Sequence, residues 1–210
     1  MKIRTTLYLL LILLIGACSG SKNLMQYRQD AENAASTGNY GQAVESWKTY
    51  FQQQSEAKNE ISGQEFAQAA KTAFSAEMNE QAIDWFDQAR YRNYADAEMY
   101  TALSSIFHEK DNLSKELSAL EYYRENFDTE NVDVNSRLFS IYDEIDMTQK
   151  ALNIWETLPE NVKGREKNLE KYFYINKELD REEVLDSLSL ELLKLNPEHT
   201  EALEQIAMKY

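Results

Sequence analysis

The chain has 210 residues but only two prolines and six glycines, so it contains few residues that interrupt helices. This composition disfavours β folds with many turns and favours helices joined by short turns, in one domain or one array of repeats. The formal net charge of −14 makes nucleic acid and anionic lipid surfaces unfavourable ligands.

The start of the chain has the layout of a secretory signal peptide. Lys2 and Arg4 precede an apolar run from Leu7 to Ile15, which is too short for a comfortable transmembrane span. The run ends in Leu-Ile-Gly-Ala-Cys, which resembles a bacterial lipobox, where the cysteine is lipidated and becomes the first mature residue. The resemblance predicts a signal peptide at 1–17, lipidation at Cys18 and a tether at 18–23. An ordinary signal peptide with an incidental cysteine is the alternative.

The residues after the cysteine predict where in the cell envelope the protein is delivered. The residue after the cysteine is Ser19 and not aspartate. By resemblance to Gram-negative lipoproteins, this favours delivery to the outer membrane. Residues 19–23 lack the acidic run that some Bacteroidetes lipoproteins use for surface export, so we expect the periplasmic face. Cys18 is the only cysteine, and therefore no intrachain disulfide can form.

A recurring pattern of paired helices follows. Gly38 and Asn39 predict a turn before a helix with Ala43, Val44, Trp47, Tyr50 and Phe51 on one face. The equivalent opening positions of later helices are Ala82, Glu116, Ala151 and Leu185, at intervals of 39, 34, 35 and 34 residues. This period resembles that of tetratricopeptide repeats (TPRs). The resemblance implies an all-α, right-handed superhelical solenoid of about five helix–turn–helix repeats plus a terminal helix.

The array is predicted over 24–210, with repeats at about 24–57, 63–96, 97–131, 132–165 and 166–199 and a partial sixth helix at 200–210. The polar run from Gln54 to Ser62 is expected to hold the extra residues of the first interval as a loop. The last helix suits either a cap or the start of further repeats. Departures from the repeat pattern are Glu116 at a small-residue position, Ser189 in place of an aromatic residue, and an early Pro159.

The aromatic residues suit a helical core more than a stacking site. Trp47 and Trp155 fall at core positions of the repeats, whereas Trp85 precedes the core residue Phe86 and is expected to be partly exposed.

No set of residues points to catalysis, to a cofactor or to a metal. His108 and His199 are isolated, and His108 has no second histidine one turn later, as a zinc site of the HExxH type requires. The acidic clusters at 143–146 and 180–183 lack the ligand spacing and central glycine of a calcium loop. We therefore expect no enzyme activity and no cofactor.

The first helices of a TPR array line a concave groove that binds extended peptides or helices, and this resemblance locates the candidate binding residues. They lack the Lys/Asn-rich carboxylate clamp of chaperone-binding members, so capture of an acidic C-terminal tail is disfavoured. The groove candidates, projected by helix phase, are Arg28, Glu32, Lys71, Phe74, Thr101, His108, Ser136, Asp143, Tyr174 and Lys177.

These features predict a lipid-anchored adaptor of a Gram-negative-type cell envelope, an outer-membrane lipoprotein that mediates protein–protein interactions in the periplasm. Its expected partners are other envelope proteins or peptides, and the membrane through Cys18. The signal, lipobox and repeats also resemble the TPR lipoprotein of the outer-membrane β-barrel assembly machinery, although the aromatic-Pro-x-Ser repeat ends common there are absent. A role in outer-membrane protein assembly is therefore one alternative. A ligand-binding receptor or an enzyme that uses groove carboxylates is another, and a structural spacer is a fourth possibility.

Overall fold

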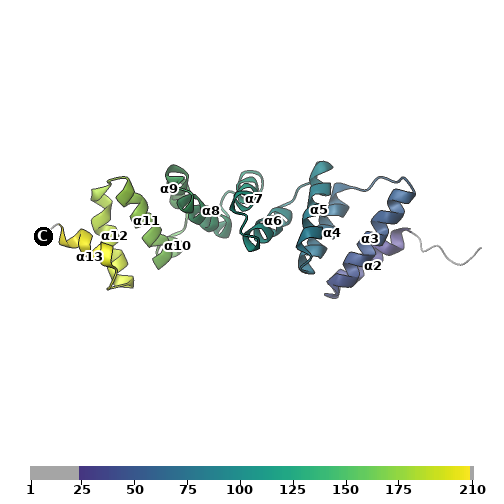
Figure 1. Cartoon of the computed structure of the whole chain (residues 1–210), viewed down its shortest axis with the longest axis horizontal. Helices are drawn as coiled ribbons and strands as arrows, with labels where there is room; N and C mark the ends of the chain where they lie inside the picture. Colours follow the sequence, from purple (N-terminus) through teal and green to yellow (C-terminus); the bar gives the residue numbers. More distant parts are fainter. Residues whose placement is uncertain (1–23, 209–210) are drawn as a thin grey trace, which may run out of the picture. The chain divides into compact units, whose positions relative to one another are not determined.

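The computed structural model describes residues 24–208, which form helices and contain no strand (Figure 1). The predicted signal peptide, Cys18 and the tether lie outside these residues. The described chain divides after Ala95 into two compact units. None of the helices between residues 24 and 208 combines the length and the hydropathy that a membrane-spanning helix requires.

The first unit consists of two helix–turn–helix pairs. Helix α2 (Leu24–Ser36) pairs with α3 (Tyr40–Glu56), and α4 (Gly63–Ser75) pairs with α5 (Asn79–Tyr91). Ser62 begins α4 with a capping box, because its hydroxyl accepts from the Glu65 backbone N–H while the Glu65 carboxylate accepts from the Ser62 backbone N–H.

The second unit contains three further pairs and a terminal helix. The pairs are α6 (Ala97–Glu109) with α7 (Leu113–Asn126), α8 (Val132–Glu144) with α9 (Thr148–Thr157), and α11 (Glu166–Glu178) with α12 (Glu182–Leu195). A one-turn helix, α10 (Glu160–Lys163), follows Pro159, and α13 (Thr200–Ala207) packs on α12. The predicted all-α fold, with paired helices and a terminal helix, is confirmed.

Every pair turns in the same way. The residues at the turns, Gly38, Glu77, Asp111, Asp146 and Asp180, all have left-handed backbone conformations, with φ between 51° and 76°. The next backbone N–H returns to a carbonyl five residues earlier, as from Asn39 to Ala34 (2.8 Å) and from Asn112 to Phe107 (2.8 Å). This bond closes a Schellman-type helix end. The turn residues lie five positions before the aligned helix openings, so the turns follow the same intervals as the repeats.

The core follows the small-then-large pattern of the repeats. Ala43, Ala82 and Ala151 are fully buried and let the paired helices approach closely, and Trp47 and Phe86 fill the space one turn later. The expectation that Trp85 is partly exposed is wrong, because its side chain is only 7% exposed. Its indole ring packs edge-on against Phe51 of the preceding pair, with ring centroids 5.4 Å apart.

Two connections differ from the simple repeat. The loop expected from Gln54 begins only after Glu56, because Gln54 belongs to α3, where its buried amide donates to the Tyr50 hydroxyl at 2.8 Å. Helix α9 ends at Thr157, two residues before Pro159, and Val162 of the following α10 is buried. Gln54 and Val162, at these two places, are therefore buried side chains of the stack.

Candidate functional site

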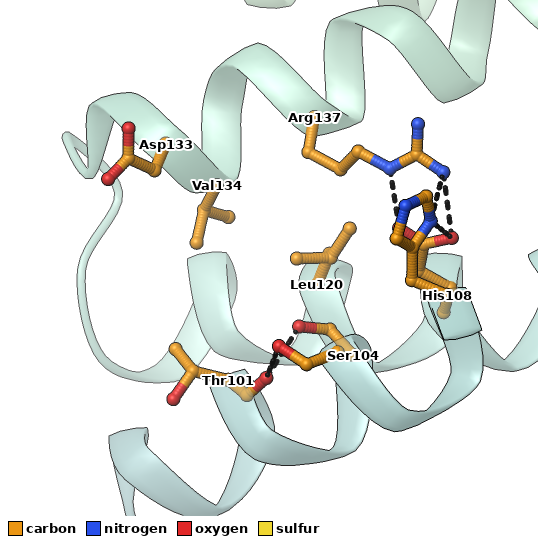
Figure 2. Close-up of a pocket in the computed structure, with 9 residues that line it drawn as sticks. Thr101, Ser104, His108, Leu120, Asp133, Val134 and Arg137 are labelled. Atoms are coloured by element: carbon orange, nitrogen blue, oxygen red, sulfur yellow. Dashed lines mark hydrogen bonds and ion pairs between the residues drawn. The ribbon is translucent and has the colours of Figure 1, made fainter.

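Three hollows adjoin one another in the second unit, and Arg137 of α8 lines all three. The α6–α8 pocket, about 280 Å³ in volume, is shown in Figure 2. The α8–α11 pocket is larger, about 480 Å³, and a third hollow of about 280 Å³ lies beside His108. The lining residues of the α6–α8 pocket are Thr101, Ser104, Ser105, His108, Glu116, Leu120, Asp133, Val134 and Arg137. Those of the α8–α11 pocket are Asp133, Ser136, Arg137, Ser140, Arg165, Glu166, Lys167 and Asn168.

A partly buried ion pair lies at the centre of this surface. Arg137 donates from Nε to Glu116 Oε1 at 2.5 Å and from Nη2 to Oε2 at 2.8 Å, so the two side chains meet in a bidentate pair. The Glu116 side chain is 4% exposed, whereas that of Arg137 is 33% exposed. Burial by itself would raise the pKa of Glu116, but the hydrogen bond and the charge of Arg137 outweigh it and hold that pKa below its usual value.

His108 completes a three-residue cluster at one end of the α6–α8 pocket (Figure 2). Its Nδ1 lies 3.0 Å from Arg137 Nη2 and 3.3 Å from Glu116 Oε2. A guanidinium group can only donate, so the contact with Arg137 is a hydrogen bond when His108 is neutral and carries its proton on Nε2. The cluster joins α6 and α7 of one pair to α8 of the next.

The position of Glu116 explains why the cluster forms here. Glu116 occupies the α7 position at which α3, α5 and α9 have a fully buried alanine. A carboxylate at that position needs a cationic partner, because an unpaired buried charge is costly. Arg137, on the first helix of the next pair, supplies the partner.

The α6–α8 and α8–α11 pockets differ in the chemistry of their walls. In the α6–α8 pocket, Leu120 and Val134 lie between the Arg137 cluster at one end and Asp133 at the other (Figure 2). The α8–α11 pocket instead collects three cationic side chains, those of Arg137, Arg165 and Lys167.

The structure brings three of the predicted groove residues to this surface. Thr101 and His108 line the α6–α8 pocket, and Ser136 lines the α8–α11 pocket. Asp143 lies farther along α8 and pairs with Lys171 of α11 at 2.6 Å.

The remaining groove candidates of the second unit contact α13. Lys177 pairs with Glu201 at 3.5 Å. Burial is the main cause that raises the pKa of Tyr174 to about 12, and a hydrogen bond to Glu201 is the second cause. Both side chains therefore connect α11 to the terminal helix.

The groove candidates of the first unit lie on α2 and α4. Arg28 pairs with Glu32 at 2.9 Å and with Glu65 at 3.1 Å, so it links these two helices. Lys71 and Phe74 of α4 are half-buried. The ion pairs give Arg28 and Glu32 a structural role, whereas their contact with a partner stays a prediction.

Sequence reasoning missed the residues that dominate the pockets: Ser104, Ser105, Glu116, Asp133, Arg137, Arg165 and Lys167. One signal for the cluster is in the sequence itself, because Glu116 is a charged residue at a small-residue position. A search for its cation among the following first-helix residues could have found Arg137. Within residues 24–208, no group of three or more His, Cys, Asp and Glu side chains is arranged to hold a metal ion.

Solved structures share this fold. YrrB, described as a TPR protein with an unusual peptide-binding site, matches with a TM-score of 0.61 and 15% identity over 90% of this chain and 93% of its own. A TPR protein from Parabacteroides merdae matches with a TM-score of 0.58 and 12% identity, over 87% of this chain and 70% of its own. MamA matches with a TM-score of 0.58 and 16% identity, over 81% of this chain and 90% of its own. No family model and no curated protein sequence matches the chain. The fold is therefore that of TPR proteins.

Proposed function

We propose that this protein is a non-catalytic adaptor that binds a segment of a partner protein on the surface of α6, α8 and α11. The observation that carries the proposal is the set of three hollows around Arg137, which the bidentate contact with Glu116 holds in one orientation. A site whose side chains are already ordered loses less conformational entropy on binding. The same fold in YrrB, which is described as having a peptide-binding site, supports a peptide as the ligand.

The adaptor acts at the cell envelope in this proposal. Support comes from the sequence alone: a short apolar run after Lys2 and Arg4, which ends at a lipobox-like junction with Cys18. Lipidation there would hold the repeats at the outer membrane, on the periplasmic side. The assembly of outer-membrane proteins is a more specific alternative, which rests on the resemblance of the lipobox and about five repeats to the barrel-assembly lipoprotein.

Photo-cross-linking from two positions tests the adaptor function. A photoreactive residue replaces Ser136, in the α8–α11 pocket, or Glu156, an exposed residue of α9 that lines none of the three hollows. In cells, position 136 is expected to give a discrete adduct that position 156 does not give, and Lys167→Glu is expected to weaken that adduct. Equal labelling from both positions would contradict binding at this surface.

Membrane retention tests the anchor separately. The Cys18→Ala variant is expected to leave the membrane fraction, and its continued retention would count against Cys18 as the anchor. Components of the β-barrel assembly machinery in the adduct would support the more specific role, and any other envelope protein would support the general one.

A further inference from the structure

We infer that the surface around Arg137 selects a peptide segment with two opposite charges: a basic side chain for the α6–α8 pocket and an acidic side chain for the α8–α11 pocket. This inference rests on the proposed function and names the class of segment that the site takes. It follows from how hydrogen-bond donors and charges are distributed on the two sides of α8.

The α6–α8 pocket offers acceptors to a ligand. The hydroxyl groups of Thr101, Ser104 and Ser105 each donate to a backbone carbonyl of their own helix, at 2.9, 2.9 and 3.0 Å. Their hydrogens are therefore already used, and the lone pairs remain for a donor. A ligand group that donates hydrogen bonds fits this wall better than one that only accepts them.

The unpaired charge in the same pocket is negative. Glu116 and Arg137 neutralise each other, whereas Asp133 is exposed and makes no ion pair with any residue of the described range. Figure 2 shows Asp133 at the end of the pocket away from Arg137, with Leu120 and Val134 between them. A lysine or arginine side chain can lay its apolar stem on these two residues and place its charge beside Asp133.

The α8–α11 pocket differs because exposed cations line it together with Asp133 and Glu166. Arg165 and Lys167 are exposed and make no ion pair within the described range, so both charges are available to a ligand. Glu166, the acidic neighbour between them, accepts a hydrogen bond from the Asn196 amide at 3.1 Å. A carboxylate that enters this pocket can pair with either cation.

Asp133 lines both pockets, so its carboxylate affects which pocket can take the acidic side chain of the segment. It lies near the start of α8, and its carboxylate repels an acidic side chain in either pocket. Only the α8–α11 pocket also offers the exposed cations Arg165 and Lys167, which can offset that repulsion. A segment that carries only acidic residues would satisfy one pocket and be repelled by the other. The mixed segment suits both.

A position-scanning peptide library tests the inference with the purified full chain in detergent. The probes are fluorescein-labelled nonapeptides of Ser and Ala, in which one Lys and one Glu are moved independently and then replaced by Gln. We expect one position to favour Lys and another to favour Glu, each by about two- to fivefold over Gln, the range for exposed ion pairs. The preferences are expected to fall as the salt concentration rises.

Two variants and their matched controls assign the preferences to residues. Asp133→Asn is expected to remove the preference for Lys and to leave that for Glu, and Lys167→Gln is expected to weaken only the preference for Glu. Glu156→Gln and Lys194→Gln remove the same charges from exposed positions that line none of the three hollows, and both are expected to behave as the unmodified protein.

The outcomes separate the two proposals. Peptide binding without a charge preference, or with preferences that Asp133→Asn and Lys167→Gln leave unchanged, overturns the inference but not the adaptor function. A complete lack of peptide binding also overturns the inference, and the cross-linking experiment then decides whether the surface binds a folded partner.

Discussion

The ion pair between Glu116 and Arg137 gives the sharpest prediction about stability. Arg137→Ala leaves the Glu116 carboxylate, with a side chain 4% exposed, without its cation. Removal of one partner from a fully buried pair costs about 3–5 kcal/mol. His108 and some water can still reach Glu116, so we expect the lower end, about 3 kcal/mol of the free energy of unfolding.

The opposite single change is expected to be milder. Glu116→Ala places at this position the residue that α3, α5 and α9 already have. Arg137 is 33% exposed and can turn to water, so the loss is the net value of its charge-assisted hydrogen bonds, about 2 kcal/mol. The double variant is expected to be more stable than Arg137→Ala alone, because it no longer contains an unpaired buried carboxylate.

Urea unfolding followed by far-ultraviolet circular dichroism measures all three variants, and an unchanged denaturant slope shows that the free energies are comparable. Glu45→Ala is the matched control, since it breaks an exposed pair with Lys48 and is expected to cost less than about 1 kcal/mol. Additive effects of Glu116→Ala and Arg137→Ala, or a loss below about 0.5 kcal/mol for Arg137→Ala, would refute the reasoning.

The other predictions concern turns, close packing and pH. Gly38→Ala is expected to lower the free energy of unfolding by about 1 kcal/mol, because φ at Gly38 is +76°. Gly41→Ala lies within a helix with open space around the new methyl group, and it is expected to raise that free energy by up to about 1 kcal/mol. Melting temperatures that shift in the same direction for both variants would contradict this account. Gly63→Ala is expected to lower the free energy of unfolding by about 1–3 kcal/mol, and with it the melting temperature, because the new Cβ would lie 2.5 Å from Tyr94 Cβ. An unchanged melting temperature would show that this contact relaxes freely. Burial would raise the pKa of Glu65, but hydrogen bonds from Tyr50 and Ser62 outweigh it and lower that pKa below 4.5, so the unfolded chain takes up the proton first as the pH falls. The stability that Glu65 contributes is thus present above about pH 4.5 and lost below it, and urea midpoints measured from pH 7 to pH 3 are expected to fall less steeply for Glu65→Gln than for the unmodified chain.

The repeat architecture could be predicted because it depends on local patterns. Alanine at positions 43, 82 and 151 repeats at the spacing of the helix pairs, and each pair closes with a backbone turn at a fixed distance from it. Neither feature needs a distant residue to be known. The same logic predicted Trp47 as a core residue, since it lies one helical turn after Ala43 on the same face.

The candidate site could be predicted only in part. Helix phase identified Thr101, His108 and Ser136 as surface residues of first helices, and the structure places them in the pockets. Helix phase does not say which side chains of neighbouring repeats meet. It therefore missed Arg137, which pairs with Glu116 of the preceding pair, and Asp133, which lines both pockets.

The sequence by itself determined the helix pairs, their period, the first turn at Gly38 and most of the apolar core, because these follow from spacings within a single repeat. The tertiary structure decided that Trp85 is buried, that Glu116 is paired, and that Asp133, Arg165 and Lys167 line the pockets beside α8. Glu116 and Arg137 are 21 residues apart in the chain, and His108 and Arg137 are 29 apart. Contacts at such separations depend on how one repeat stacks on the next, and no pattern within a repeat specifies which side chains then meet.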